Sequence, residues 1–167
     1  MTEPAPPDEG RGPLAAVAEP VRRVVTVRTD RAHCFDAFTR RLGEWWPLAT
    51  HALRPGEVAS VVFERRLGGE LYETYADGGS CRWGEVIEWK PPEKFAITWD
   101  IATGPGGPTE VHVEFRELGP ALTRVELEHR HWQRLAEEAG RREGYDGPKG
   151  WSGVLARYVA YAESLDR

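Results

Sequence analysis

The alternation of apolar and polar residues predicts a run of β-strands through the middle of the chain. At 111–116, for example, Val113 and Phe115 alternate with polar residues, as in a strand with one buried face. Turns such as Asp-Gly-Gly at 77–79 join consecutive segments as hairpins. The strand-like segments are 21–29, 58–65, 70–75, 81–89, 95–99, 111–116 and 123–130. They predict an antiparallel sheet of six to seven strands.

The apolar period changes to 3.6 in two regions, which indicates helices. Asp30 is a good N-cap for a first helix. After it, the segment 44–47 is a second short helical turn or a loop, ended by Pro47 because proline disfavours helical conformation in the preceding residue. A long amphipathic helix closes the chain, and only the sheet offers a large apolar surface to cover it. Its apolar face consists of Trp151, Val154, Leu155, Tyr158, Ala162 and Leu165.

Two segments have no clear period. Residues 1–19 are rich in proline and charge, so we expect a disordered tail followed by one domain at 20–167. The charged, Gly-rich segment 137–147 precedes the last helix. It is predicted to be a mobile flap over one end of a cavity, or merely a linker.

Composition narrows the functional classes. The chain has 167 residues, seven Trp and a net charge of −5, which argues against a nucleic-acid-binding surface. No apolar run approaches the ~20 residues of a membrane-spanning helix, and the acidic, Pro-rich start does not look like a secretory signal. Cys34 and Cys81 form neither a disulfide framework nor a CxxC pair. We expect a cytoplasmic protein with reduced thiols and no metal or cofactor.

Several short motifs lie within residues 21–166. They are CFDAFT at 34–39, Trp45-Trp46-Pro47, Gly68-Gly69, Gly84-Glu85-Val86, Pro91-Pro92, Ile97-Thr98-Trp99, TRVEL at 123–127 with His129, Trp132, and Gly150-Trp151. Together they resemble the SRPBCC superfamily of START-like proteins, and in it the branch named after the activator of the heat-shock-chaperone ATPase. The resemblance implies an α+β helix-grip fold. In this fold a curved antiparallel sheet wraps around the long C-terminal helix, two short helices follow the first strand, and a cavity lies between sheet and helix.

Large aromatic side chains on a concave sheet and a facing helix either fill the space between them or line a ligand cavity. We assign no catalytic residue. The candidate cavity residues are Trp45, Trp46, Phe63, Tyr72, Trp83, Glu85, Trp99, His129, Trp132, Trp151 and Tyr158.

Glu85 and His129 are the most informative polar candidates. By alternation Glu85 shares a face with Trp83 and Ile87, which would point a carboxylate into the interior unless a β-bulge turns it to solvent. His129 would hydrogen-bond within the pocket. A metal shared between His129 and His131 has little support, because no carboxylate or thiol is placed to complete the site.

Three functions remain open. The first is non-enzymatic binding of a hydrophobic or amphipathic small molecule, with Glu85, His129 or Tyr72 orienting its polar end. The second is a cyclase- or aromatase-type enzyme that moves protons in the same cavity. The third is a bacterial-type, stress-related module that binds a chaperone or regulator. A ligand-sized cavity with Glu85 pointing inward would favour the first two, and a cavity filled by Trp side chains would favour the third. We expect a monomer or homodimer.

Overall fold

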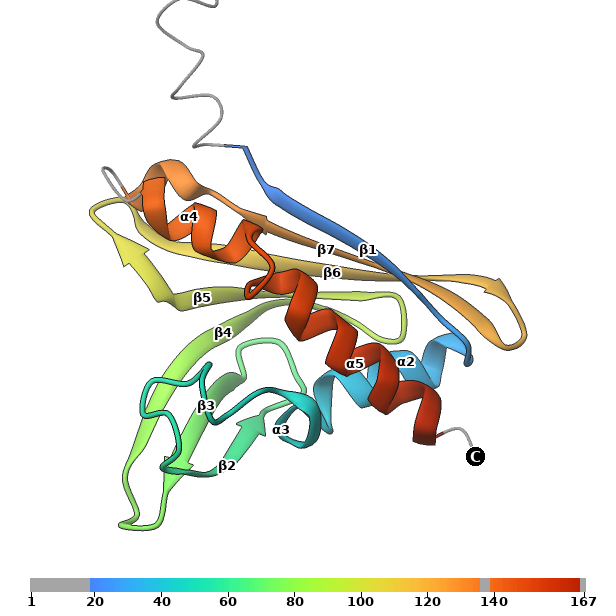
Figure 1. The fold of residues 1–167 in the computed structure, drawn as a ribbon, viewed down its shortest axis with the longest axis horizontal. Coiled ribbons are helices and arrows are strands. Elements are labelled where there is room, and N and C mark those ends of the chain that lie inside the picture. The colour runs from blue at the N-terminus through green and yellow to red at the C-terminus, as the bar shows by residue number, and fades with distance from the viewer. Residues whose placement is uncertain (1–18, 136–138, 166–167) are drawn as a thin grey trace, which may run out of the picture.

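A single curled sheet dominates the structure, a computed structural model that describes residues 19–135 and 139–165 (Figure 1). Within these ranges, seven antiparallel strands lie in the order β1-β7-β6-β5-β4-β3-β2. The strands are β1 (Val21–Val27), β2 (Val58–Phe63), β3 (Glu70–Tyr75), β4 (Ser80–Lys90), β5 (Lys94–Gly104), β6 (Gly107–Gly119) and β7 (Leu122–Arg130). The tail predicted at 1–19 lies, up to residue 18, outside the described residues.

The helices lie on one side of this sheet, and α5 crosses its concave face (Figure 1). The Asp30 carboxylate caps α2 by accepting a 2.7 Å hydrogen bond from the His33 backbone N–H. The α+β helix-grip prediction is therefore confirmed, including two short helices after the first strand. No helix in the described ranges is long and apolar enough to cross a membrane. The helices are α2 (Arg31–Thr39), α3 (Leu42–Trp45), the 3₁₀ helix η1 (Trp132–Leu135), α4 (Ala139–Asp146) and α5 (Trp151–Leu165).

The apolar face predicted for the last helix is the face that α5 buries. Trp151, Leu155 and Tyr158 are almost completely buried against the sheet and α2. The Tyr158 hydroxyl also donates a 2.8 Å hydrogen bond to the backbone carbonyl of Cys34, in α2. Burying a large apolar side chain stabilises a fold by about 1.5–3 kcal/mol, so this face holds α5 firmly in the curl of the sheet.

A β-bulge in β4 overturns the inward orientation predicted for Glu85. Leu71 of β3 pairs with Gly84, whereas Tyr72 pairs with Arg82, so one extra residue in β4 has no partner. After this bulge Val86 is buried and Glu85 faces outward. The Glu85 side chain is 44% exposed and lies 3.5 Å from the Arg82 guanidinium.

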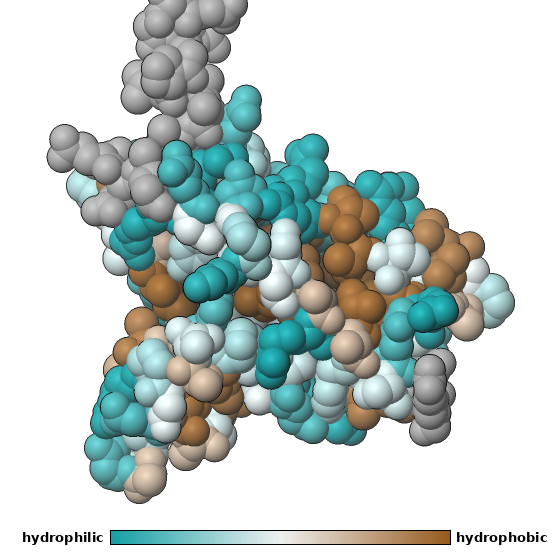
Figure 2. All heavy atoms as spheres, viewed as in Figure 1, coloured by the Kyte–Doolittle hydropathy of each residue, from teal (hydrophilic) through white to brown (hydrophobic). Residues whose placement is uncertain are grey.

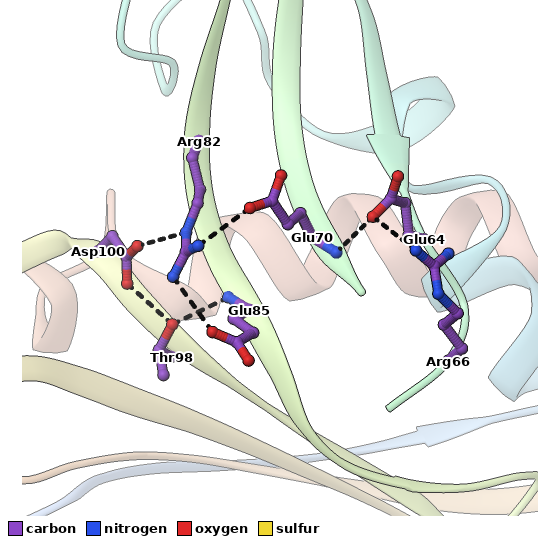
Figure 3. A network of polar contacts seen from close by, with 7 residues as sticks. All are labelled: Glu64, Arg66, Glu70, Arg82, Glu85, Thr98 and Asp100. Carbon is purple, nitrogen blue, oxygen red and sulfur yellow. Dashed lines mark hydrogen bonds and ion pairs between the residues drawn. The ribbon is translucent and has the colours of Figure 1, made fainter. Parts of the chain in front are cut away.

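Figure 3 shows the resulting network on the outer face of the sheet. Arg82 contacts the carboxylates of Glu70, Glu85 and Asp100 at 3.0, 3.5 and 2.8 Å. Glu85 therefore belongs to a surface ion-pair network. Ile87, which we expected on the same inward face, is 38% exposed.

Tyr72 also points away from the interior. In β3 the buried residues are Leu71, Glu73 and Tyr75, and alternation places Tyr72 on the opposite face. The prediction that Tyr72 lines a cavity is therefore wrong, and Glu73 occupies the inward position beside it.

The segment predicted as a flap or linker contains helix α4. Tyr145 of this helix packs on His129 and Trp132, with ring centroids 4.9 and 5.3 Å away. Arg141 donates a hydrogen bond to the carbonyl of Ile101. The segment thus has helical structure and covers one end of the sheet; residues 136–138 lie outside the description.

Figure 2 shows the face that carries α5. Polar residues cover most of it, and apolar residues reach the surface mainly along the boundary between β1 and α5 and beside a hollow at the left. The hollow separates the arm formed by β2, β3 and β4 from α4 (Figures 1 and 2). The strong bend of β4 produces this arm.

Candidate ligand-binding site

An aromatic cluster on the concave side of the sheet is centred on Trp46. The Trp46 ring centroid lies 5.3 Å from that of Trp83, 5.9 Å from Trp99 and 5.8 Å from Trp151. These separations are typical of favourable aromatic pairs. The four rings come from the connection after α3, from β4, from β5 and from α5. The cluster therefore joins sheet, helix and connecting segment at one point.

Three further candidates pack beside this cluster. Trp45 and Tyr158 have ring centroids 5.1 Å apart, between α3 and α5. Phe63 of β2 packs on Phe95 at 5.4 Å. Trp45 is almost fully buried and Phe63 is partly buried against the same core.

Each of the six buried Trp side chains uses its indole N–H within the protein. The acceptors are backbone carbonyls, a carboxylate, a hydroxyl and an imidazole nitrogen, so these indoles have no spare donor for a ligand. The pairs are Trp45 to Ala37 O, Trp46 to His51 O, Trp83 to Glu73, Trp99 to Tyr145 Oη, Trp132 to His129 O, and Trp151 to His129 Nδ1.

Glu73 is the buried carboxylate of the site, and the sequence analysis missed it. It accepts hydrogen bonds from the Trp83 indole at 2.6 Å and the Tyr75 hydroxyl at 2.5 Å. The backbone N–H groups of Leu53 and Arg54 donate to it at 2.9 and 3.0 Å. Four donors occupy the acceptor sites of one carboxylate, and two of them belong to the segment between α3 and β2. The alternation of Leu71 and Tyr75 around Glu73 was the signal that would have identified it.

The Glu73 environment sets its charge. Burial alone raises the pKa of a carboxyl group, but the hydrogen bonds from Tyr75, Leu53, Trp83 and Arg54 outweigh burial and lower the pKa of Glu73. Glu73 is therefore an ionised, fully hydrogen-bonded group that joins β3 to the connecting segment.

His129 is fully buried and uses both ring nitrogens. Nδ1 accepts from the Trp151 indole N–H at 3.0 Å, which leaves the proton on Nε2. Nε2 lies 2.7 Å from Thr109 Oγ1, and Thr109 in turn donates to the carbonyl of Ala102 at 3.2 Å. Burial lowers the pKa of His129 well below its usual value, so the imidazole is neutral.

The metal hypothesis that we considered for His129 gains no support. His131 lies after the end of β7, and its Nε2 faces Glu110 at 3.5 Å, away from the nitrogens of His129. Among the described residues, no group of three or more His, Cys, Asp or Glu side chains is arranged to hold a metal ion.

The aromatic packing leaves an enclosed void of only about 10 Å³ between sheet and helix. A void of this size holds at most about one water molecule. The interior is therefore filled, with the Trp46 ring at its centre. The lining residues are Phe38, Leu42, Trp46, Phe63, Leu71, Phe95, Ile97, Trp99, Val111 and Trp151.

A larger pocket of about 570 Å³ lies between the segment that follows Trp46 and the first turns of α5; we call it the mouth pocket. Pro47, directly after Trp46, is part of its wall. His51 Nε2 lies 2.7 Å from the carbonyl of Lys149, which ties the connecting segment to the start of α5. The mouth pocket thus borders the segment that carries Trp46, and the Trp46 ring itself lines the interior void. The mouth pocket is lined by Pro47, Thr50, His51, Lys149, Gly153, Val154 and Arg157.

A second depression, of about 390 Å³, lies on the outer face of the sheet and includes Glu88, Lys94 and Glu128. Three of its glutamates, Glu88, Glu126 and Glu128, pair with neighbouring cations, for example Glu128 with Arg130 at 2.7 Å. It lacks the aromatic enclosure of the concave side, so we place the candidate site at Trp46 and the mouth pocket.

Residues 28–163 match the family described as activator of Hsp90 ATPase homolog 1-like protein. The chain belongs to this family. A comparison with curated proteins gave no match. The match confirms the family resemblance inferred from the motifs, and structural neighbours of the SRPBCC type agree with it.

Solved structures similar to this family member include two with named activities. An anthrahydroquino-gamma-pyrone synthase, Txn09, is 35% identical with a TM-score of 0.59, and the alignment covers 85% of this chain and 96% of Txn09. CalC, a self-sacrificing resistance protein from Micromonospora echinospora, is 26% identical with a TM-score of 0.63, covering 89% of this chain and 97% of CalC. Protein NE0264 from Nitrosomonas europaea, at 15% identity and a TM-score of 0.63, shares the fold; that alignment covers 89% and 97% of the two chains.

Proposed function

We propose that the protein binds a hydrophobic or amphipathic small molecule with a flat ring system, between the sheet and α5, in the place that the Trp46 ring occupies. The observation that carries this proposal is the position of Trp46. Its ring fills the centre of the concave side, and a pocket of about 570 Å³ borders the chain segment that follows it, at Pro47. A ligand ring that displaces the indole would contact its four aromatic neighbours, which are Trp45, Trp83, Trp99 and Trp151.

Trp46 is well suited to leave its place. It lies on the segment between α3 and β2, whereas Trp83 and Trp99 are held in strands. It is the most exposed of the six buried Trp residues, at 7%. Its indole N–H donates to the backbone carbonyl of His51 on the same segment, so turning the ring outward breaks one local hydrogen bond and no strand pairing. Displacing Trp46 therefore breaks packing but leaves the sheet and its hydrogen bonds intact.

The chemistry of the walls favours aromatic ligands. Trp83, Trp99 and Trp151 present ring faces and edges, and aromatic pairs add about 0.5–1.5 kcal/mol beyond the apolar area that they bury. The similar protein Txn09 is named for an anthrahydroquino-gamma-pyrone, a fused-ring aromatic product. A fused-ring aromatic molecule is accordingly the ligand class that we propose.

A filled interior is also the feature that we expected of an interaction module. The binding proposal is preferred because the ring at the centre belongs to a connecting segment beside an open pocket. A binding site for a chaperone would instead call for an exposed apolar surface at the mouth, and the mouth pocket contains cationic side chains.

A cyclase-type enzyme is the second candidate, and its support is the 35% identity to a synthase. Binding without catalysis fits the geometry better. A general base needs an unoccupied lone pair, and the acceptor sites of Glu73 and His129 are already taken. A cytoplasmic location, a single domain and a monomeric or homodimeric state complete the proposal.

Ligand titration of wild type and Trp46→Ala tests this function. We expect anthraquinone-2-carboxylate to raise the melting temperature of both proteins, with at least threefold tighter binding to Trp46→Ala, because the variant has no ring to displace. Trp89→Phe is the matched control, since Trp89 packs on Phe95 in the same core but does not line the void. Failure of a panel of fused-ring compounds to bind either protein would rule the function out.

Native mass spectrometry of the protein purified from its own host separates carrier from enzyme. A retained small molecule of constant mass supports binding without turnover. Conversion of that molecule to a dehydrated, ring-closed product during incubation would support the cyclase-type alternative instead.

A further inference from the structure

We propose that the mouth pocket binds the anionic end of an amphipathic ligand, a carboxylate or similar oxyanion, through Lys149 and Arg157. This inference rests on the proposed function and specifies its ligand class. The aromatic end would lie at Trp46 and the anion would remain at the mouth, so one molecule would occupy both parts of the site.

The charges of the mouth pocket carry this inference. Its lining includes Lys149, Arg157 and His51 and no acidic residue. Within residues 19–135 and 139–165, no carboxylate forms an ion pair with Lys149 or Arg157. The chain nevertheless has a net charge of −5, and other arginines, such as Arg82, contact several carboxylates. Two cations in one pocket, neither of them paired with a carboxylate of the described residues, therefore favour an anionic guest.

Arg157 is also held in position. Its Nε donates a 2.8 Å hydrogen bond to the backbone carbonyl of Trp45. The two terminal nitrogens make no other hydrogen bond to described residues, so both remain available for an oxyanion. A guanidinium fixed in this way loses little side-chain freedom when it binds an anion.

The start of α5 adds to the positive potential. Gly153 and Val154, in the first turn of this helix, form part of the pocket wall. Gly153 has no side chain there, so the backbone of the first turn lies at the pocket surface. The N-terminal end of a helix carries a partial positive charge, which adds to that of Lys149 and Arg157.

Part of the remaining wall is apolar. Pro47 and Val154 line the same pocket, and Pro47 is bonded directly to Trp46. A volume of about 570 Å³ lies within the range of small-molecule sites. The pocket thus combines cationic groups with apolar residues beside the segment that carries Trp46, which is the complement of an aromatic acid.

A matched pair of ligands tests this assignment. Anthraquinone-2-carboxylate and the neutral anthraquinone-2-carboxamide would be titrated against wild type, Lys149→Gln and Arg157→Gln by calorimetry at low and high salt. We expect wild type to prefer the carboxylate, and each variant to lose roughly threefold to tenfold of that preference, because exposed ion pairs contribute modestly. Added salt should weaken binding of the carboxylate only.

Lys90→Gln is the control, because it makes the same change at an exposed lysine, the last residue of β4. It should leave the preference unchanged. Arg157→Lys is a second variant that keeps the positive charge. Melting temperatures of the Arg157 variants show whether loss of the hydrogen bond to Trp45 has destabilised the fold. Equal binding of both ligands, or a preference that survives in Lys149→Gln and Arg157→Gln alike, overturns the anion site and leaves the proposed function standing. If neither ligand binds to wild type or to Trp46→Ala, both the anion site and the proposed function are overturned.

Discussion

Two glutamates on neighbouring strands have opposite environments. Glu73 of β3 is fully buried beneath four hydrogen-bond donors, whereas Glu85 of β4 lies in an exposed ion-pair network (Figure 3). The sequence analysis selected Glu85, because regular alternation from Trp83 pointed it inward. Alternation from Leu71 to Tyr75 identifies Glu73 equally well. What the sequence does not reveal is which strand contains a bulge.

Glu73→Gln should destabilise the fold by about 2–4 kcal/mol, because the amide turns an NH₂ group toward N–H donors and loses charge-assisted hydrogen bonds. Glu85→Gln is the matched control and should change stability by less than about 0.5 kcal/mol, since its partner is at the surface. Urea unfolding of both variants measures the difference. Equal effects of the two substitutions would contradict the inference that Glu73 stabilises the fold by joining β3 to the segment between α3 and β2.

The stability difference between wild type and Glu73→Gln should depend on pH. The folded-state pKa of Glu73 is lowered, so its contribution to stability is fully present above the unfolded-state pKa of about 4.3 and is lost as pH falls through the folded-state pKa. The stability gap between wild type and Glu73→Gln should therefore shrink in acid. Glu110 and Glu128, whose pKa values are also lowered, are present in both proteins and cancel in this difference.

At the scale of elements, the period of the sequence predicted the strands and the last helix well, because hydrophobic burial imposes that period directly. It did not predict the bulge in β4 or the helical structure of α4, for different reasons. The bulge in β4 depends on the close approach of Gly84 to β5, where a Cβ atom would lie 1.8 Å from the Thr98 carbonyl oxygen. Helix α4 contains Gly140 and Gly144, which weaken helix propensity, and its Tyr145 anchors it by tertiary contacts.

Gly84→Ala tests the bulge. The new methyl group would force β4 away from β5, so we expect a loss of at least about 2 kcal/mol of stability. Gly119→Ala, at the turn between β6 and β7, meets no atom within 4 Å and is the control. Its effect should stay within about 0.5 kcal/mol. Unfolding curves for both proteins give the comparison, and a well-tolerated Gly84→Ala would show that the bulge does not require glycine.

For the whole molecule, the sequence predicted a sheet that grips a helix, and the structure shows that the grip is closed around Trp46. Motifs such as Trp45-Trp46-Pro47 were sufficient for the family because they form the turns and core contacts of the fold. They were insufficient for the site, because a pattern of large aromatic residues is the same whether they line a cavity or fill it. Only the packing distances distinguish the two.

Displacement of Trp46 can be observed directly by ¹⁹F NMR of protein that contains 5-fluorotryptophan, with the Trp46 resonance assigned from Trp46→Phe. Upon addition of anthraquinone-2-carboxylate, we predict that this resonance moves toward the position of a solvent-exposed indole. The Trp89 resonance, assigned from Trp89→Phe, should move much less, because Trp89 does not line the void around Trp46. A Trp46 resonance that stays in place while the ligand binds would contradict a binding site between the sheet and α5.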